Sequence, residues 1–175
     1  REDGVTLVEG KPFFPIGIYG IHRHAFNRNN YDVALKDLHA AGFNFAHSYV
    51  DRFSPDFLSA AARNGLGVWT FAKAAVRGDS WFLEKGRADS SVLAWYIGDD
   101  TSMNTTPQEL IDHDEAVRQL DGTRITCQAD GTRAVAAKSN LQDYVNGADV
   151  FMPEIYPIDG FRDERCVAEV CRDMD

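Results

Sequence analysis

The chain has 175 residues, of which 44% are hydrophobic, so it is long enough to bury the core of one ordinary domain. Its formal charge of -9 argues against a nucleic-acid partner, because such a surface needs a basic stripe. No run of about 18 apolar residues occurs, which argues against a membrane span. The three cysteines, Cys127, Cys166 and Cys171, have neither zinc-site spacing nor the density of a disulfide framework. The composition leaves the compartment open.

A short hairpin is predicted over about residues 5–14, where two extended pieces flank a turn that contains Gly10 and Pro12. The second piece continues into a first buried strand over residues 15–20. His22 and His24 follow in a polar loop. The hairpin thus precedes the first strand of the main domain.

From the first strand onward, the chain alternates between strand and helix patterns six times. Strands are predicted over residues 15–20, 43–49, 66–71, 92–97, 124–129 and 149–152. Helices are predicted over residues 31–41, 54–65, 80–85, 106–120, 141–145 and 161–172. Gly42 and Gly65 end the first two helices, and Thr106 with Glu109 forms a capping box for the fourth. Strict alternation demands a parallel sheet with right-handed crossovers.

Two α/β architectures satisfy this alternation, the doubly wound sheet and the TIM barrel. No strand is followed by a glycine-rich phosphate fingerprint, which weakens the nucleotide-binding doubly wound alternative, and we expect no cofactor. A complete barrel takes about 250 residues and two further strand–helix units. We therefore expect a single α/β domain of the (β/α)8 TIM-barrel type over residues 1–175, represented by about six units, with the C-terminal units missing. Missing strands or a partner chain would cover the two open edges.

The most informative stretch reads VLAWYIGDD, residues 92–100. Residues 92–97 are apolar on both faces, which suits a strand in the buried centre of a parallel sheet. The strand ends in Asp99 and Asp100, and barrels place their chemistry at the carboxyl ends of their strands. The alternative is a simple turn, in which one of these aspartates caps the next segment.

Five segments in order carry a family resemblance: GKPFFPIGIYG, AAGFNFAHSY, NGLGVWTFA, VLAWYIGDD and DVFMPEIYPI. Together they resemble (β/α)8-barrel glycoside hydrolases of the large clan whose acid and nucleophile lie on strands four and seven. The resemblance is greatest to uncharacterised bacterial relatives whose fourth strand reads AWYxxDEP. It implies an oligo- or polysaccharide substrate, and it favours a secreted or periplasmic location.

The resemblance also implies that Asp100 is the general acid/base, at a position where the family usually has glutamate. Aspartate is one methylene shorter, and a displacement of about 1 Å can cost roughly 100-fold in rate. The family's nucleophile comes from a seventh strand, which this sequence does not contain. We therefore expect this chain alone to lack the nucleophile.

Glycoside hydrolysis needs two carboxyl groups that flank the scissile bond. Asp99 and Asp100 cannot form that pair, because neighbouring side chains point to opposite sides of an extended backbone. Glu154, at the end of the sixth strand, is the candidate partner; alternatively it binds a sugar hydroxyl or caps a turn. Other candidates for contact with substrate lie at strand ends, with core packing as the alternative: Asp99, Tyr19, His22, His24, His47, Tyr49, Gln128 and Tyr156.

Two other functions compete with glycoside hydrolysis. One is a barrel relative that binds carbohydrate, or serves as a scaffold, without catalysis. The other is an aldolase-type lyase that uses Lys73 as a Schiff-base lysine, which would require that lysine to be desolvated. Metal-dependent hydrolysis is rejected: His22 and His24 have a metal-like spacing, but the ends of the last three strands offer no histidine.

Overall fold

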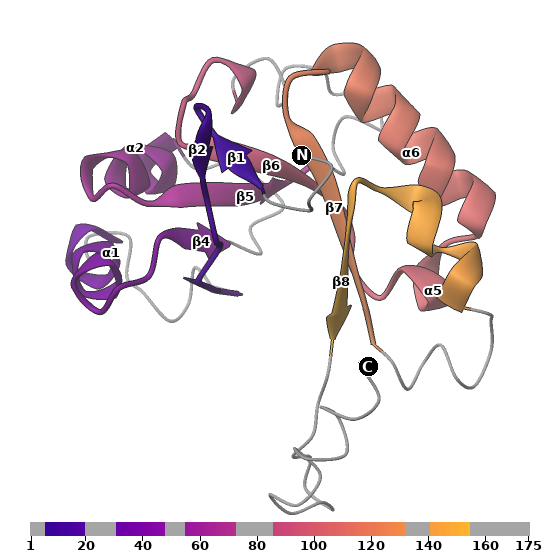
Figure 1. Ribbon diagram of the computed structural model, residues 1–175, viewed down its shortest axis with the longest axis horizontal. Helices are drawn as coiled ribbons and strands as arrows, with labels where there is room; N and C mark the ends of the chain where they lie inside the picture. The colour runs from indigo at the N-terminus through magenta and orange to yellow at the C-terminus, as the bar shows by residue number, and fades with distance from the viewer. Residues whose placement is uncertain (1–5, 20–30, 48–54, 73–85, 132–140, 155–175) are drawn as a thin grey trace, which may run out of the picture.

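The computed structural model describes residues 6–19, 31–47, 55–72, 86–131 and 141–154. Its centre is a curled, six-stranded parallel sheet flanked by helices (Figure 1). The strands lie in sequence order, as β3 (Gly17–Ile18), β4 (Phe45–His47), β5 (Gly67–Phe71), β6 (Val92–Gly98), β7 (Ile125–Gly131) and β8 (Val150–Glu154). All five neighbouring pairs are parallel. This topology is that of an incomplete TIM-type barrel, which confirms the predicted fold class.

A two-stranded antiparallel hairpin precedes the sheet, with β1 (Leu7–Val8) paired to β2 (Lys11–Pro12). Its turn residues Glu9 and Gly10 both have positive φ values, of 50° and 77°. A tight turn of this kind matches the twist of the two strands it joins. The hairpin lies at the amino ends of the barrel strands, because Leu7 and Val8 line a hollow there together with the first residues of β6 and β7.

The helices are α1 (Tyr31–Ala40), α2 (Pro55–Arg63), α5 (Thr101–Asn104) and α6 (Pro107–Leu120). Figure 1 shows α1 and α2 side by side next to β4 and β5, while α5 and α6 lie beside β6 and β7. Gly42 and Gly65 follow α1 and α2 in left-handed conformation, as the predicted helix stops require. None of the described helices is long and apolar enough to cross a membrane.

The capping box of α6 is confirmed. The Thr106 hydroxyl accepts a hydrogen bond from the Glu109 backbone N–H at 3.3 Å, and Glu109 accepts one from the Thr106 N–H at 2.8 Å. Two details differ from the prediction. The short helix α5 was not predicted, and two 3₁₀ turns, Leu141–Asp143 and Val145–Gly147, replace the helix expected over residues 141–145. The helices predicted over residues 80–85 and 161–172 lie outside the described residues.

Two apolar layers form on the two faces of the sheet. The layer beneath the helices includes Leu35, Trp95 and Leu110, and the layer on the inner face of the curl includes Phe71 and Tyr96. Strand β6 supplies both layers, since Trp95 and Tyr96 are each completely buried on opposite faces. The predicted central strand is therefore confirmed as apolar on both sides.

Candidate active site at the carboxyl ends of the strands

The chain leaves β6 through an irregular turn that ends at Asp100. The pairing register between β6 and β7 shifts between Tyr96 and Gly98, and such irregularities re-aim the side chains that follow them. Asp100 then adopts a left-handed conformation, with φ 48° and ψ 47°, at the N-cap position of α5. Its side chain makes no capping hydrogen bond. Asp100 thus occupies the cap position without using its carboxylate as the cap.

The Asp100 carboxylate lies beside the end of β7. Its Oδ1 is 3.8 Å from where a Cβ atom would stand at Gly131, and Gly131 pairs in register with Glu154 on β8. Val150 and Met152 of β8 pack against the inner apolar layer, so strand alternation places Glu154 on the same inner face. Asp100 and Glu154 therefore flank a residue without a side chain. Neighbouring strands lie about 4.8 Å apart, so the backbones of β6 and β8 are separated by about 10 Å.

Asp99 is held by two tyrosine hydroxyls. Tyr19, directly after β3, and Tyr96 of β6 each donate a hydrogen bond to Asp99 Oδ1 at 2.8 Å, and the two phenol oxygens are 3.0 Å apart. His47 of β4 stacks on the Tyr19 ring with centroids 4.7 Å apart, and Tyr96 meets the His47 ring edge-on at 4.9 Å. The structure thus brings together three predicted site residues from three different strands.

Tyr96 also belongs to this cluster, although its place in the sequence favoured a role in the core. Its ring is indeed buried in the inner layer, yet its hydroxyl reaches Asp99. A buried tyrosine hydroxyl usually finds a hydrogen-bond partner, and Tyr96 lies three residues before a carboxylate at the end of the same strand. That spacing was the available signal.

Burial and nearby negative charges raise the pKa values of two groups at this end of the sheet, Asp100 and Tyr96. Burial, followed by the negative charges of Asp99 and Asp130, raises the pKa of Asp100 above the usual aspartate range. Burial, together with the hydrogen bonds to Tyr19 and Asp99, also raises the pKa of Tyr96 far above that of an ordinary phenol. Tyr96 therefore remains a protonated hydrogen-bond donor, and Asp100 holds its proton to a higher pH than a solvated aspartate does.

Gln128, a predicted contact for substrate, lies on the other face of β7. Its amide nitrogen donates to the Tyr144 carbonyl and its amide oxygen accepts from the Thr101 hydroxyl, so both groups are used inside the protein. Asp130, on the same face, accepts hydrogen bonds from Thr101 and from the backbone and side chain of Ser102. These contacts join α5 to β7. The prediction for Gln128 is corrected accordingly, because strand alternation turns it toward the helices rather than the rim.

Several other predicted residues lie outside the part of the chain that the structure describes. They are His22, His24, Tyr49, Tyr156 and the alternative Schiff-base lysine, Lys73. Their proposed contacts remain predictions.

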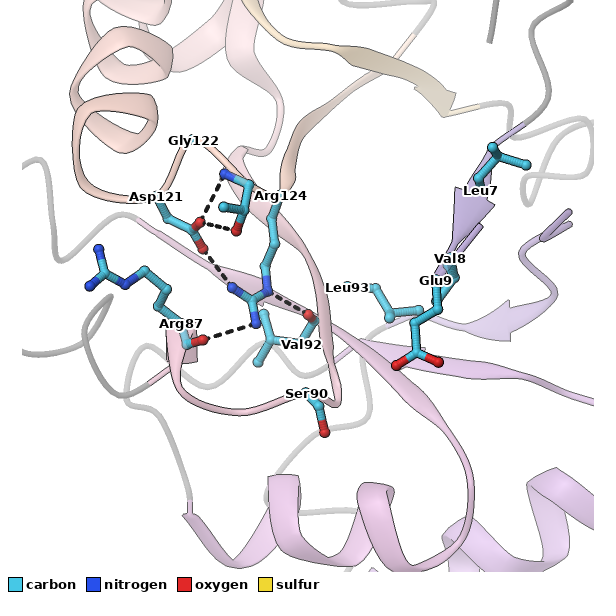
Figure 2. Close-up of a pocket in the computed structure, with 11 residues that line it drawn as sticks. Leu7, Val8, Glu9, Arg87, Ser90, Val92, Leu93, Asp121, Gly122 and Arg124 are labelled. Carbon is cyan, nitrogen blue, oxygen red and sulfur yellow. Dashed lines mark hydrogen bonds and ion pairs between the residues drawn. The ribbon is translucent and has the colours of Figure 1, made fainter. Parts of the chain in front are cut away.

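A hollow of about 600 Å³ lies at the opposite, amino end of the strands, beneath the hairpin (Figure 2). Arg124 crosses its wall and donates to the carboxylate of Asp121 at 2.8 Å and to the carbonyl oxygens of Val92 and Arg87. Although burial opposes it, hydrogen bonds from Thr123, Trp95 and Arg124 lower the pKa of Asp121 to about 2. Polar groups that form hydrogen bonds with one another in this way stabilise a fold. In barrels, the residues at the amino ends of the strands serve stability rather than catalysis.

The fold and the position of the rim residues together define an incomplete barrel with carboxylates at the carboxyl end of its sheet. No protein-family model and no curated protein matches the chain. The match is instead to solved structures, and those named below are glycosidases.

The apo structure of Bacteroides uniformis β-glucuronidase 3 superposes with a TM-score of 0.70 and 17% identity, over 94% of this chain and 23% of that one. The Parabacteroides merdae β-glucuronidase with glycerol in its active site superposes with a TM-score of 0.67 and 16% identity, over 94% of this chain and 24% of that one. A glycosyl hydrolase family 2 member from Bacteroides cellulosilyticus superposes with a TM-score of 0.62 and 20% identity, over 83% of this chain and 22% of that one. At these identities the likeness shows a shared fold, and the chain spans about a quarter or less of the length of these proteins.

Proposed function

We propose that this chain forms the acid/base half of a glycoside hydrolase barrel, with Asp100 as the general acid/base and an oligo- or polysaccharide as substrate. One observation carries the proposal: the Asp100 carboxylate is not used as a cap and reaches Gly131, the strand partner of Glu154, at the carboxyl end of the sheet. The glycosidase fold of the structural neighbours supports it.

The chemistry follows from the charge that develops on the leaving oxygen. As the glycosidic bond breaks, Asp100 donates its proton to that oxygen. If a nucleophile from the seventh strand forms a covalent intermediate, Asp100 then accepts a proton from the water that hydrolyses it. An acid must still hold its proton at the working pH, and burial with the nearby charges of Asp99 and Asp130 raises the pKa of Asp100 in that direction. A solvated aspartate would already have lost its proton.

The second carboxylate must act on the opposite face of the sugar. Glu154 is the described carboxylate at a suitable level, and as a base it would activate water at the wider, inverting separation. In the family that the sequence resembles, the nucleophile instead comes from a seventh strand, and Glu154 would then bind a sugar hydroxyl. Replacement of Glu154 by glutamine separates the two roles: a base loses nearly all turnover, whereas a hydroxyl ligand mainly raises KM.

The test is hydrolysis of a panel of aryl glycosides by this chain and by a polypeptide extended through the seventh strand that the resemblance predicts. We expect the 175-residue chain to bind saccharide weakly and to turn over at background rate, and the extended form to be active. Asp100→Asn should then lower kcat by about 10²–10⁴-fold. The matched control is Asp112→Asn, at an exposed position of α6, which should leave activity unchanged.

Two results would contradict the proposal. If the extended form binds saccharide without any turnover, the barrel is a carbohydrate-binding or scaffold protein. If Asp100→Asn retains the activity of the Asp112→Asn control, the acid lies elsewhere.

A further inference from the structure

Two tyrosines from distant strands converge on a single oxygen atom. Tyr19 follows β3, the first strand of the sheet, whereas Tyr96 lies on β6, the fourth, and Asp99 follows that strand; both hydroxyls lie 2.8 Å from Asp99 Oδ1. We call Tyr19 and Tyr96 the tyrosine pair. The adjacent aspartate, Asp100, receives no capping hydrogen bond and lies next to Gly131 instead.

This arrangement treats the two neighbouring carboxyl groups differently. A hydrogen bond from a neutral hydroxyl is strongest to an ionised carboxylate, so two such donors stabilise the charged form of Asp99. A fixed negative charge on Asp99 then favours the neutral form of Asp100. When the environments of two titratable groups push their pKa values apart in this way, the group with the higher pKa is the acid.

We propose that the tyrosine pair holds Asp99 ionised and thereby favours the protonated form of Asp100, so that Tyr19 and Tyr96 are positioning residues for the acid. The proposal rests on the proposed function of Asp100 for its catalytic meaning, although the location of the proton can be measured without turnover. If the hydroxyls are removed, Asp99 competes with Asp100 for the proton. A fraction of the molecules then carries the proton on Asp99 instead of Asp100.

Other groups at the rim bear on the same equilibrium. Asp130 lies on β7 and hydrogen-bonds with Thr101 and Ser102, and Glu154 lies at the end of β8. The negative charge of Asp130 favours the protonated form of Asp100, so it acts in the same direction as the tyrosine pair. His47 of β4 stacks on Tyr19 and supports its ring. The tyrosine pair donates two hydrogen bonds to the Asp99 carboxylate, whereas Asn104 donates to the backbone carbonyl oxygens of both aspartates.

The experiment titrates the aspartate carboxyl carbons by NMR in the wild type, Tyr19→Phe, Tyr96→Phe and the double variant. Each phenylalanine should move the Asp99 titration to higher pH by about one unit, and the double variant should move it further. Tyr144→Phe is the control, because it removes a buried tyrosine hydroxyl that donates to the Thr105 carbonyl instead. Thermal melts identify any variant that fails to fold, and Tyr19, which is 42% exposed, tolerates the change even if Tyr96 does not.

Kinetics of the active, extended protein give a second readout. The phenylalanine variants should lower kcat about tenfold without moving the alkaline limb of the pH profile to lower pH. Asp99→Asn, which removes the charge but keeps an acceptor, should move that limb to lower pH. An Asp99 titration in the tyrosine variants that matches Tyr144→Phe would overturn the inference, even if Asp100→Asn is inactive. If Asp100→Asn is active while the titration shifts, the proposed function fails and the proton assignment stands.

Discussion

The pKa values of two aspartates, Asp121 at the amino end of the sheet and Asp100 at the carboxyl end, are shifted in opposite directions. At the amino end, Asp121 receives hydrogen bonds from Trp95, Thr123 and Arg124, and these lower its pKa to about 2 despite burial. At the carboxyl end, burial and like charges raise the pKa of Asp100. The hydrogen bonds to Asp121 stabilise the fold. Asp100 instead retains unfavourable like charges nearby, as residues of functional sites commonly do.

Strand β6 connects the two ends through consecutive residues. Trp95 turns to the helix side and donates from its indole nitrogen to Asp121 at 2.9 Å, while Tyr96 turns inward and donates to Asp99. Strand alternation therefore assigns one residue to stability and the next to the candidate site. Mutations at the two ends should separate stability from activity.

The largest effect is expected at the amino end, from Asp121→Asn. The change leaves Arg124, whose guanidinium is largely buried, without its charge partner, and loss of one partner from a buried pair costs about 3–5 kcal/mol of unfolding free energy. Urea denaturation measures the loss. Asp32→Asn is the control: its pair with Arg63 is exposed on both sides, and exposed pairs contribute little. Equal losses for the two variants would show that the amino end has no special role in stability.

A smaller effect is the acid sensitivity of the wild type. Because the pKa of Asp121 falls from the unfolded value of 3.8 to about 2 in the folded state, its ionised form stabilises the fold above about pH 4. That contribution, about 2 kcal/mol, is lost as pH falls from about 4 to about 2. Unfolding free energies measured across this range should decline less steeply in Asp121→Asn. Parallel declines in the two proteins would assign the sensitivity to other groups.

The smallest effect is expected at the carboxyl end and has the opposite sign. A raised folded pKa means that the Asp100 contribution is fully present below the unfolded pKa and is lost as pH rises through the folded value. Asp100→Asn should therefore raise the melting temperature slightly at neutral pH, and the gain should vanish at acid pH. Asparagine also tolerates the left-handed backbone at this position. A melting temperature lower than that of Asp112→Asn at neutral pH would contradict this account.

The sequence predicted the fold because its strands and helix ends carry strong local signals. The apolar run of β6, the glycine stops after α1 and α2, and the capping box of α6 all lie where they were expected. Helix α5 was missed because a helix of only four residues, Thr101–Asn104, shows no apolar periodicity.

The site was harder to predict, because alternation shows which residues share a face but not which face is the inner one. In β7 the polar residues Thr126, Gln128 and Asp130 face the helices, and the small apolar Cys127 and Ala129 face inward. Both sets are buried, so burial does not distinguish the inner face of β7 from the face toward the helices. Gln128 was therefore assigned to the rim in error, and Tyr96 was assigned to the core alone.

The central claim, that Asp100 donates a proton to the leaving group, is tested most directly by leaving-group dependence in the active, extended protein. Dinitrophenyl glycosides release an acidic phenol that needs little protonation, whereas methoxyphenyl glycosides need the acid. For Asp100→Asn we predict a loss of about 10²-fold or more in the bond-cleaving step with methoxyphenyl substrates, and little loss with dinitrophenyl substrates. An equal loss with both would contradict the claim, because it would mean that Asp100 supports binding or structure rather than proton transfer.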